Sequence, residues 1–238
     1  MKYFLSERPK NPVIMHSSPS MGLISTITSK FLIDHLEVKQ IGYMESEHIS
    51  PLTAIHKSEI VNPITLFYNK EHNLVIVQCL TEMKGYEYEF ANSLLDLAKE
   101  LKAKELLIVE GIPAQDSQQE TSIFFYTNKK SKKAGKIKPL TEGIVMGLTA
   151  ALLLKAKEFP ISCFFAEAHS NLPDAEAAAK VVDGLNSYMK MTVDVNPLLE
   201  QAKKFESQLK QFLAKGQAPQ IKPLKANLEE KEETNYVG

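Results

Sequence analysis

The sequence predicts an α/β fold with a mixed, largely parallel sheet that is covered by helices on both faces. Short apolar strand patterns alternate with segments in which apolar residues recur at helical spacing, as in other sheets of this kind. One pair of strand patterns is separated by a short polar segment and predicts a hairpin, which makes the sheet mixed. The 238 residues are 44% hydrophobic and 24% charged, which excludes disordered, collagen-like and membrane-spanning classes.

The first half of the chain contains one strand–helix–strand succession, followed by a loop and a hairpin. The turn SSPSMG separates a strand pattern from the first helical pattern, and KEHN separates the two strands of the hairpin. In chain order we expect a strand, a helix, a strand, a loop and a hairpin, over Pro12–His16, Gly22–Leu32, Val38–Met44, Glu45–Glu59, and Ile64–Tyr68 with Leu74–Leu80.

In the second half of the chain, predicted strands and helices alternate more regularly. Its strands are compact apolar runs, and its middle helix is apolar on all sides, as expected for a helix in the core. We expect a helix, two strands, a core helix, a strand and an alanine-rich helix, over Gly85–Leu101, Glu105–Val109, Ser122–Thr127, Glu142–Lys155, Pro160–Ala166 and Asp174–Lys190.

The last predicted helix covers residues 196–215. Asn196 is a good N-cap, Pro197 suits the first helical position, and Gly216 stands where a helix stops. Its apolar residues follow a 4-3-4-3 spacing that is typical of a narrow helix–helix seam, formed either within the chain or between subunits. The seam residues are Leu198, Ala202, Phe205, Leu209 and Phe212.

The chain is expected to have one folded domain and a tail. Residues 1–216 contain all the strand and helix patterns, including the C-terminal helix. Residues 217–238 contain two prolines and the charged run EEKEET, with too little apolar mass to fold alone, so we expect a flexible arm.

Charge and cysteine content restrict the partners and the compartment. The net charge of −1 gives no general attraction for nucleic acid or an anionic membrane. The longest apolar run, Gly143–Leu154, is too short to cross a bilayer, and the first residues do not resemble a signal peptide. Cys79 and Cys163 lie in apolar strand patterns and are expected to be buried thiols. These features predict a cytoplasmic protein with neither a nucleic-acid nor a membrane partner.

The basic residues are nearly all lysine. Arg8 is the only arginine among 28 basic residues, so a site built on a bidentate arginine clamp is disfavoured. Lys129–Lys138 contains six lysines but no arginine or aromatic residue, which indicates a solvated loop rather than a nucleic-acid site. Docking to an acidic protein surface is the alternative.

Familiar catalytic and cofactor motifs are missing from the sequence. It has no phosphate-binding loop, dinucleotide fingerprint, HExxH, GxSxG or CxxC, so we expect no cofactor, no metal and no catalytic residue. The alternative is a carboxylate-lined crevice, because Glu82, Glu110 and Glu167 each follow a predicted strand and His169 lies close behind. Such a group could bind a metal ion or a small ligand, or do acid–base chemistry. The simpler interpretation is that each carboxylate caps a helix or pairs with a lysine.

The order of several segments resembles the proteasome-assembly-chaperone-2 family, and most closely its archaeal members. The resemblance runs over about residues 12–213. It is carried by PSMGLISTITSKFLI, VIVQCLTEMKGYEYEFANSLLDLAKEL, LLIVEGI, LTEGIVMGLTAALLL and FFAEAHSNLPDAEAAAKVVDGL. It implies a three-layer α/β/α fold similar to that of nucleoside phosphorylases, self-association into a homo-oligomer, and no catalysis.

The same resemblance implies a partner for the tail. Members of the family assist proteasome assembly, and some archaeal relatives engage the α subunits of the core particle through their C-terminal segments. Proteasome activators commonly end in a hydrophobic residue, tyrosine and one further residue. Here Tyr236 is third from the end, followed by Val237 and Gly238, so the tyrosine is displaced by one position. Either the α-ring pocket accepts this shift, or the tail binds elsewhere or has no role.

Overall fold

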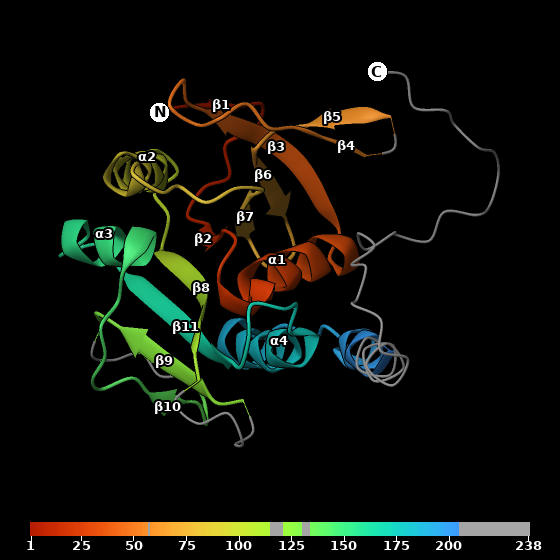
Figure 1. Cartoon of the computed structure of the whole chain (residues 1–238). Coiled ribbons are helices and arrows are strands. Elements are labelled where there is room, and N and C mark those ends of the chain that lie inside the picture. The colour runs from red at the N-terminus through yellow and green to blue at the C-terminus, as the bar shows by residue number, and fades with distance from the viewer. Residues whose placement is uncertain (57, 115–120, 130–133, 205–238) are drawn as a thin grey trace. The chain divides into compact units, whose positions relative to one another are not determined.

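The computed structural model describes residues 1–56, 58–114, 121–129 and 134–204 of the chain (Figure 1). Met1–Ala202 forms one compact unit, and almost all of the second unit, Lys203–Gly238, lies outside the described residues. The helices are η1 (Met21–Leu23), α1 (Ile24–His35), α2 (Glu87–Glu100), α3 (Gly147–Lys155) and α4 (Ala175–Met189). The strands are β1 (Lys2–Leu5), β2 (Val13–Ser17), β3 (Val38–Glu45), β4 (Ala54–His56), β5 (Glu59–Val61), β6 (Ile64–Asn69), β7 (Leu74–Cys79), β8 (Glu105–Pro113), β9 (Ile123–Thr127), β10 (Lys138–Pro139) and β11 (Ile161–Ala168).

A nine-stranded sheet in the order β1-β3-β6-β7-β2-β8-β11-β9-β10 forms the centre of the unit. The four central strands, β7, β2, β8 and β11, are parallel to one another. The strands β1, β3 and β6 extend one side as an antiparallel meander, and β9 joins the other side antiparallel to β11. The predicted mixed, largely parallel sheet is therefore confirmed, and its parallel part is the buried centre.

Helices cover both faces of this sheet, which makes the predicted three layers (Figure 1). On one face, Phe90 and Leu94 of α2 and Leu152 of α3 pack against Ile14, Val77 and Ile108, among other residues of one core cluster. On the other face, α1 and α4 pack against the alternate residues of the same strands, including Met15, Ile76 and Leu107. Both sides of each central strand are buried, and most residues of these strands are apolar for this reason.

The local sequence explains where several elements begin. The Asp174 side chain accepts a hydrogen bond from the Ala177 N–H at 2.8 Å and caps α4 where the sequence predicts it. Cys79 and Cys163 are buried free thiols, as expected. Over the part of the chain that the structure describes, no helix has the length and apolar character needed to cross a membrane.

Three local predictions are wrong. The stretch Glu45–Glu59, expected to be a loop, contains β4 and the start of β5, which pair antiparallel in a small separate hairpin. Strand β1 was not expected, because its pattern mixes charged and apolar residues and it pairs only at the edge of the sheet. Helix α3 begins at Gly147 rather than Glu142, because the backbone of Met146 is extended and Gly147 has a φ of 63°.

Candidate functional site

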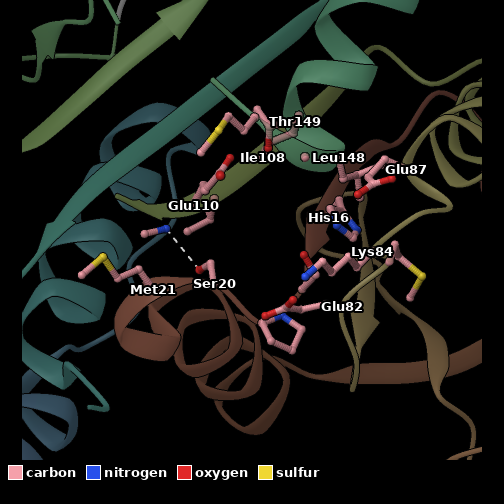
Figure 2. Close-up of a pocket in the computed structure, with 17 residues that line it drawn as sticks. His16, Ser20, Met21, Glu82, Lys84, Glu87, Ile108, Glu110, Leu148 and Thr149 are labelled. Atoms are coloured by element: carbon pink, nitrogen blue, oxygen red, sulfur yellow. Dashed lines mark hydrogen bonds between the residues drawn. The ribbon is translucent and has the colours of Figure 1, made fainter. Parts of the chain in front are cut away.

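A pocket of about 210 Å³ lies at the carboxyl ends of the parallel strands β2, β7 and β8 (Figure 2). Parallel sheets commonly place their ligand sites at this edge, because the loops that follow the strands converge there. The turn between β2 and η1 forms one wall, and the loop after β7 and the first turns of α2 and α3 complete it. The lining residues are His16, Ser18–Met21, Glu82–Lys84, Glu87, Ile108–Gly111 and Met146–Thr149.

His16 is the most buried polar residue of this pocket. It follows Ile14 on the face of β2 that α2 covers, and its ring contacts Phe90 edge-on with 5.2 Å between centroids. Its side chain is only 3% exposed, and neither ring nitrogen has a hydrogen-bond partner among the described residues. Burial lowers the pKa of His16 to about 3, so the imidazole is neutral and keeps one nitrogen lone pair free.

Glu110 lies on the neighbouring strand β8, two residues beyond Ile108, which is the register partner of His16. Leu106, Ile108 and Glu110 alternate along one face, so the carboxyl group lies against the first turn of α3. Burial raises the pKa of Glu110, and a hydrogen bond with the Thr149 side chain partly offsets this effect. The Oε2 atom is buried without a hydrogen-bond partner in the described part of the chain.

The turn between β2 and η1 lies unusually close to β8. The Ser20 hydroxyl accepts a hydrogen bond from the Gly111 N–H at 3.1 Å, which leaves its own hydrogen available to a ligand (Figure 2). A Cβ atom on Gly111 would lie 2.0 Å from the Met21 carbonyl oxygen, so only glycine fits there. Gly22, with a φ of 64°, then turns the chain toward α1.

The rim of the pocket carries charged side chains of both signs. Glu82 and Lys84 belong to the loop after β7, and Glu87 begins α2. Figure 2 shows Lys84 and Glu82 on the side of His16, across the opening from Glu110. Counting Glu110, the lining has three carboxyl groups against one ammonium group.

The structure brings together only part of the predicted crevice. Glu82 and Glu110 line the same pocket, whereas Glu167 and His169 do not. Glu167 instead accepts a hydrogen bond from the Ser122 N–H at 3.1 Å, and His169 is exposed. Sequence reasoning missed His16, although its place two residues after Ile14 in a strand pattern was a signal that it faces the core.

In the described lining, catalytic and metal-binding groups would be recognised by the contacts between their side chains. Among the lining residues that the structure describes, no hydrogen bond joins His16 or Glu110 to a serine or cysteine nucleophile. Within the described residues there is also no group of three or more histidine, cysteine or acidic side chains placed to hold a metal ion.

Comparison with known proteins identifies the family. Residues 14–213 match the sequence pattern of the PAC2 family, which is most of the chain. The chain belongs to the PAC2 family. This confirms the resemblance found in the sequence, including its extent to residue 213.

Similar proteins include solved structures of the same fold. PbaA of Pyrococcus furiosus, described as an archaeal homolog of proteasome-assembly chaperone, is 23% identical with a TM-score of 0.80, over 90% of this chain and 92% of that one. PbaB of the same organism, described as an archaeal proteasome activator, is 22% identical with a TM-score of 0.77, over 89% and 98%. An uncharacterized protein of Methanocaldococcus jannaschii, MJ0106, is 25% identical over 85% of this chain and 86% of its own length.

The two other predicted sites, the seam of the last helix and the C-terminal tail, lie at the end of this PAC2 family chain. Residues 196–204 are helical, as expected, and Leu198 is 1% exposed within the core cluster formed with α1 and α4. Ala202 is half-buried. The remaining seam residues, Phe205, Leu209 and Phe212, and the tail residues Tyr236, Val237 and Gly238 lie outside the described residues.

Proposed function

We propose that this PAC2 family protein is a non-enzymatic, proteasome assembly chaperone-like scaffold that self-associates and binds the α subunits of the proteasome core particle through its C-terminal tail. The observation that carries the proposal is the family match over residues 14–213, which leaves the tail outside the matched region. The descriptions of PbaA and PbaB as a proteasome-assembly chaperone homolog and a proteasome activator support the choice of partner.

The composition of the tail is suited to docking. Residues 217–238 are mostly polar, and Tyr236 is the only aromatic residue among them. A single aromatic side chain at the end of a long polar arm can reach a pocket on a large partner. Several such arms on one oligomer would add weak individual contacts into a tight attachment.

Exposed apolar side chains on the folded unit support self-association. Ile144 is 93% exposed, Met146 74% and Leu154 61%, and all three belong to α3 or the segment that leads into it. Apolar side chains gathered on one surface often mark a protein–protein contact. Leu198, in contrast, is buried in the core of its own chain, so that end of the seam supports an intramolecular role.

A cytoplasmic location is part of the same proposal. Both cysteines are buried free thiols, which is the usual state of cysteine in a reducing compartment.

The proposal is tested by capture of isolated proteasome α-rings on immobilised protein. The full-length chain, a chain ending at residue 216, and the variant Tyr236→Ala are compared, with Asn235→Ala as the matched control. We expect the full-length chain and Asn235→Ala to retain α-rings, and both other forms to lose them. Light scattering on each form measures whether the oligomer persists without the tail.

Each result has a definite meaning. Retention of α-rings by the chain that ends at residue 216 would move the binding site from the tail to the folded unit. Failure of every form to bind would remove the proteasome from the proposal. Loss of binding by Asn235→Ala as well as Tyr236→Ala would show that the tail does not act through its tyrosine.

A further inference from the structure

The pocket between β2, β8 and α3 contains two buried polar groups that nothing in the α-ring proposal uses. Both nitrogens of His16 and the Oε2 atom of Glu110 are buried without hydrogen-bond partners in the described chain. Leaving such groups unpaired costs stability, and proteins seldom retain them without a purpose. Both line the same pocket, on adjacent strands and on the same face of the sheet.

We propose that this pocket binds a small molecule carrying a protonated primary amine, with the Glu110 carboxylate as its counter-ion and a His16 ring nitrogen as a second acceptor. An alkylammonium group has three N–H donors, and the pocket offers acceptors on three sides. Glu110 and His16 provide the inner two, and the rim carboxylates Glu82 and Glu87 provide the outer ones. The inference is independent of the tail and of any proteasome contact.

The charge of the lining favours a cation over an anion. Three carboxyl groups face the pocket against the single ammonium group of Lys84. The first turn of α3 would attract an anion, but Glu110 already lies there beside Thr149. An anionic ligand would therefore meet repulsion from Glu110 at the inner wall and from Glu82 and Glu87 at the rim.

A cationic ligand would also remove the cost that burial imposes on Glu110. Burial raises the pKa of this carboxyl group because its charged form is poorly solvated there. Lys84, the one ammonium group of the described lining, lies on the rim with Glu82, across the opening from Glu110. The groups closer to Glu110 supply no positive charge. His16 is neutral, and the Cys163 thiol, which faces Glu110 from β11, is held in its neutral form by a raised pKa. A bound ammonium group would supply the missing charge.

The size of the pocket limits the ligand. Its volume of about 210 Å³ is below the roughly 300–1,000 Å³ of pockets that hold drug-sized molecules. A short aliphatic amine of a few carbon atoms fits this space. Its alkyl part would lie against Ile108, Met83 and Leu148 of the lining.

The test uses isothermal titration calorimetry of the full-length protein with three probes of similar size: n-butylamine, butan-1-ol and butyrate. The variants are Glu110→Gln, which keeps the shape and removes the charge, and Glu167→Gln as the matched control on the adjacent strand β11. Glu167 does not line the pocket, and glutamine there can still accept the hydrogen bond from Ser122. Nitrogen NMR of the His16 ring reports whether the ligand reaches it.

We expect n-butylamine to bind, to shift the ring nitrogen signals of His16, and to bind more tightly than the alcohol or the carboxylate. Loss of a charge-assisted hydrogen bond should weaken n-butylamine binding by about tenfold to a hundredfold in Glu110→Gln and leave Glu167→Gln unchanged. Butyrate binding as tightly as the amine, equal affinity of Glu110→Gln and the original chain, or no binding of n-butylamine would each overturn the proposal. None of these results would bear on α-ring capture.

Discussion

At the scale of single residues, His16 and Glu110 are buried polar side chains in a mostly apolar sheet centre, and each has a buried polar atom without a partner in the described chain. His16 lies two residues after Ile14 along β2, and Glu110 lies two residues after Ile108 along β8. Each therefore faces the same side of the sheet as the apolar residue before it. Burial drives both toward their neutral forms, lowering the pKa of the imidazole and raising that of the carboxyl group. The inner part of the pocket is therefore polar, and burial disfavours the charged form of both groups.

Glu110→Gln should stabilise the folded protein at neutral pH. Because the folded-state pKa of Glu110 is raised, the carboxyl group favours folding below its ordinary pKa and loses that contribution as the pH rises through the folded value. At about pH 7 the variant should gain about 1–3 kcal/mol in the free energy of unfolding, because glutamine has no charge to desolvate in the buried position. The gain should shrink toward zero at about pH 4, close to the ordinary glutamate pKa.

Urea unfolding at both pH values measures this effect, with the exposed Glu82→Gln as control. Glu82 has no comparable burial, so its variant should unfold like the original chain at each pH. A Glu110→Gln variant less stable than the original at neutral pH would mean that the carboxylate is paired in the folded state.

At the scale of elements, close approach of the turn before α1 to strand β8 shapes the pocket. The Ser20 hydroxyl and the Met21 carbonyl both lie against Gly111, and an added Cβ there would overlap the Met21 oxygen. This contact involves backbone, which cannot rotate away as the end of a side chain can. The position of the turn, and with it one wall of the pocket, therefore depends on glycine in β8.

Gly111→Ala should destabilise the chain by at least about 1–3 kcal/mol, the usual cost of overfilling a tightly packed site. The matched control is Gly143→Ala, where the added Cβ would meet only Leu140 side-chain atoms at 3.9 Å. The midpoint of urea unfolding should fall for the first variant and stay within error for the second. Equal midpoints would show that the turn shifts at no cost.

At the scale of the whole molecule, the exposed apolar side chains of the α3 region indicate which surface would form the contact between subunits. In the proposed self-association, Ile144 and Leu154 would be buried between subunits, together with Tyr88 of α2, whose ring lies 5.6 Å from the Lys155 ammonium. The β4–β5 hairpin exposes a second, smaller pair, Ile55 and Ile60.

Ile144→Ser should lower the molecular mass of the assembly measured by light scattering, because it removes most of the apolar area of a 93% exposed side chain from the contact. The matched control, Ile55→Ser, changes a side chain that is 77% exposed on the hairpin and should leave the mass unchanged. The reverse pattern would assign the contact to the hairpin. An unchanged mass for both variants would exclude both surfaces.

The order of strands and helices, the burial of both cysteines and the family could all be read from the sequence. The family was recognisable from the order of whole segments. The helices were recognisable from the spacing of their apolar residues, and the central strands from compact apolar runs, which arise because both faces of the sheet centre are buried. The same rule failed at β1 and at β4–β5, where strands pair at an edge or apart from the main sheet and carry little pattern.

Only the tertiary structure decided which polar residues meet. Glu82 and Glu110 converge while Glu167 turns to Ser122, and His16 joins them because β2 inserts between β7 and β8. The first residue of α3 could not be predicted from the sequence either, because the apolar run around Met146 is compatible with both an extended and a helical backbone. Periodicity tells which face of an element is buried, but strand order and backbone turns determine what that face meets.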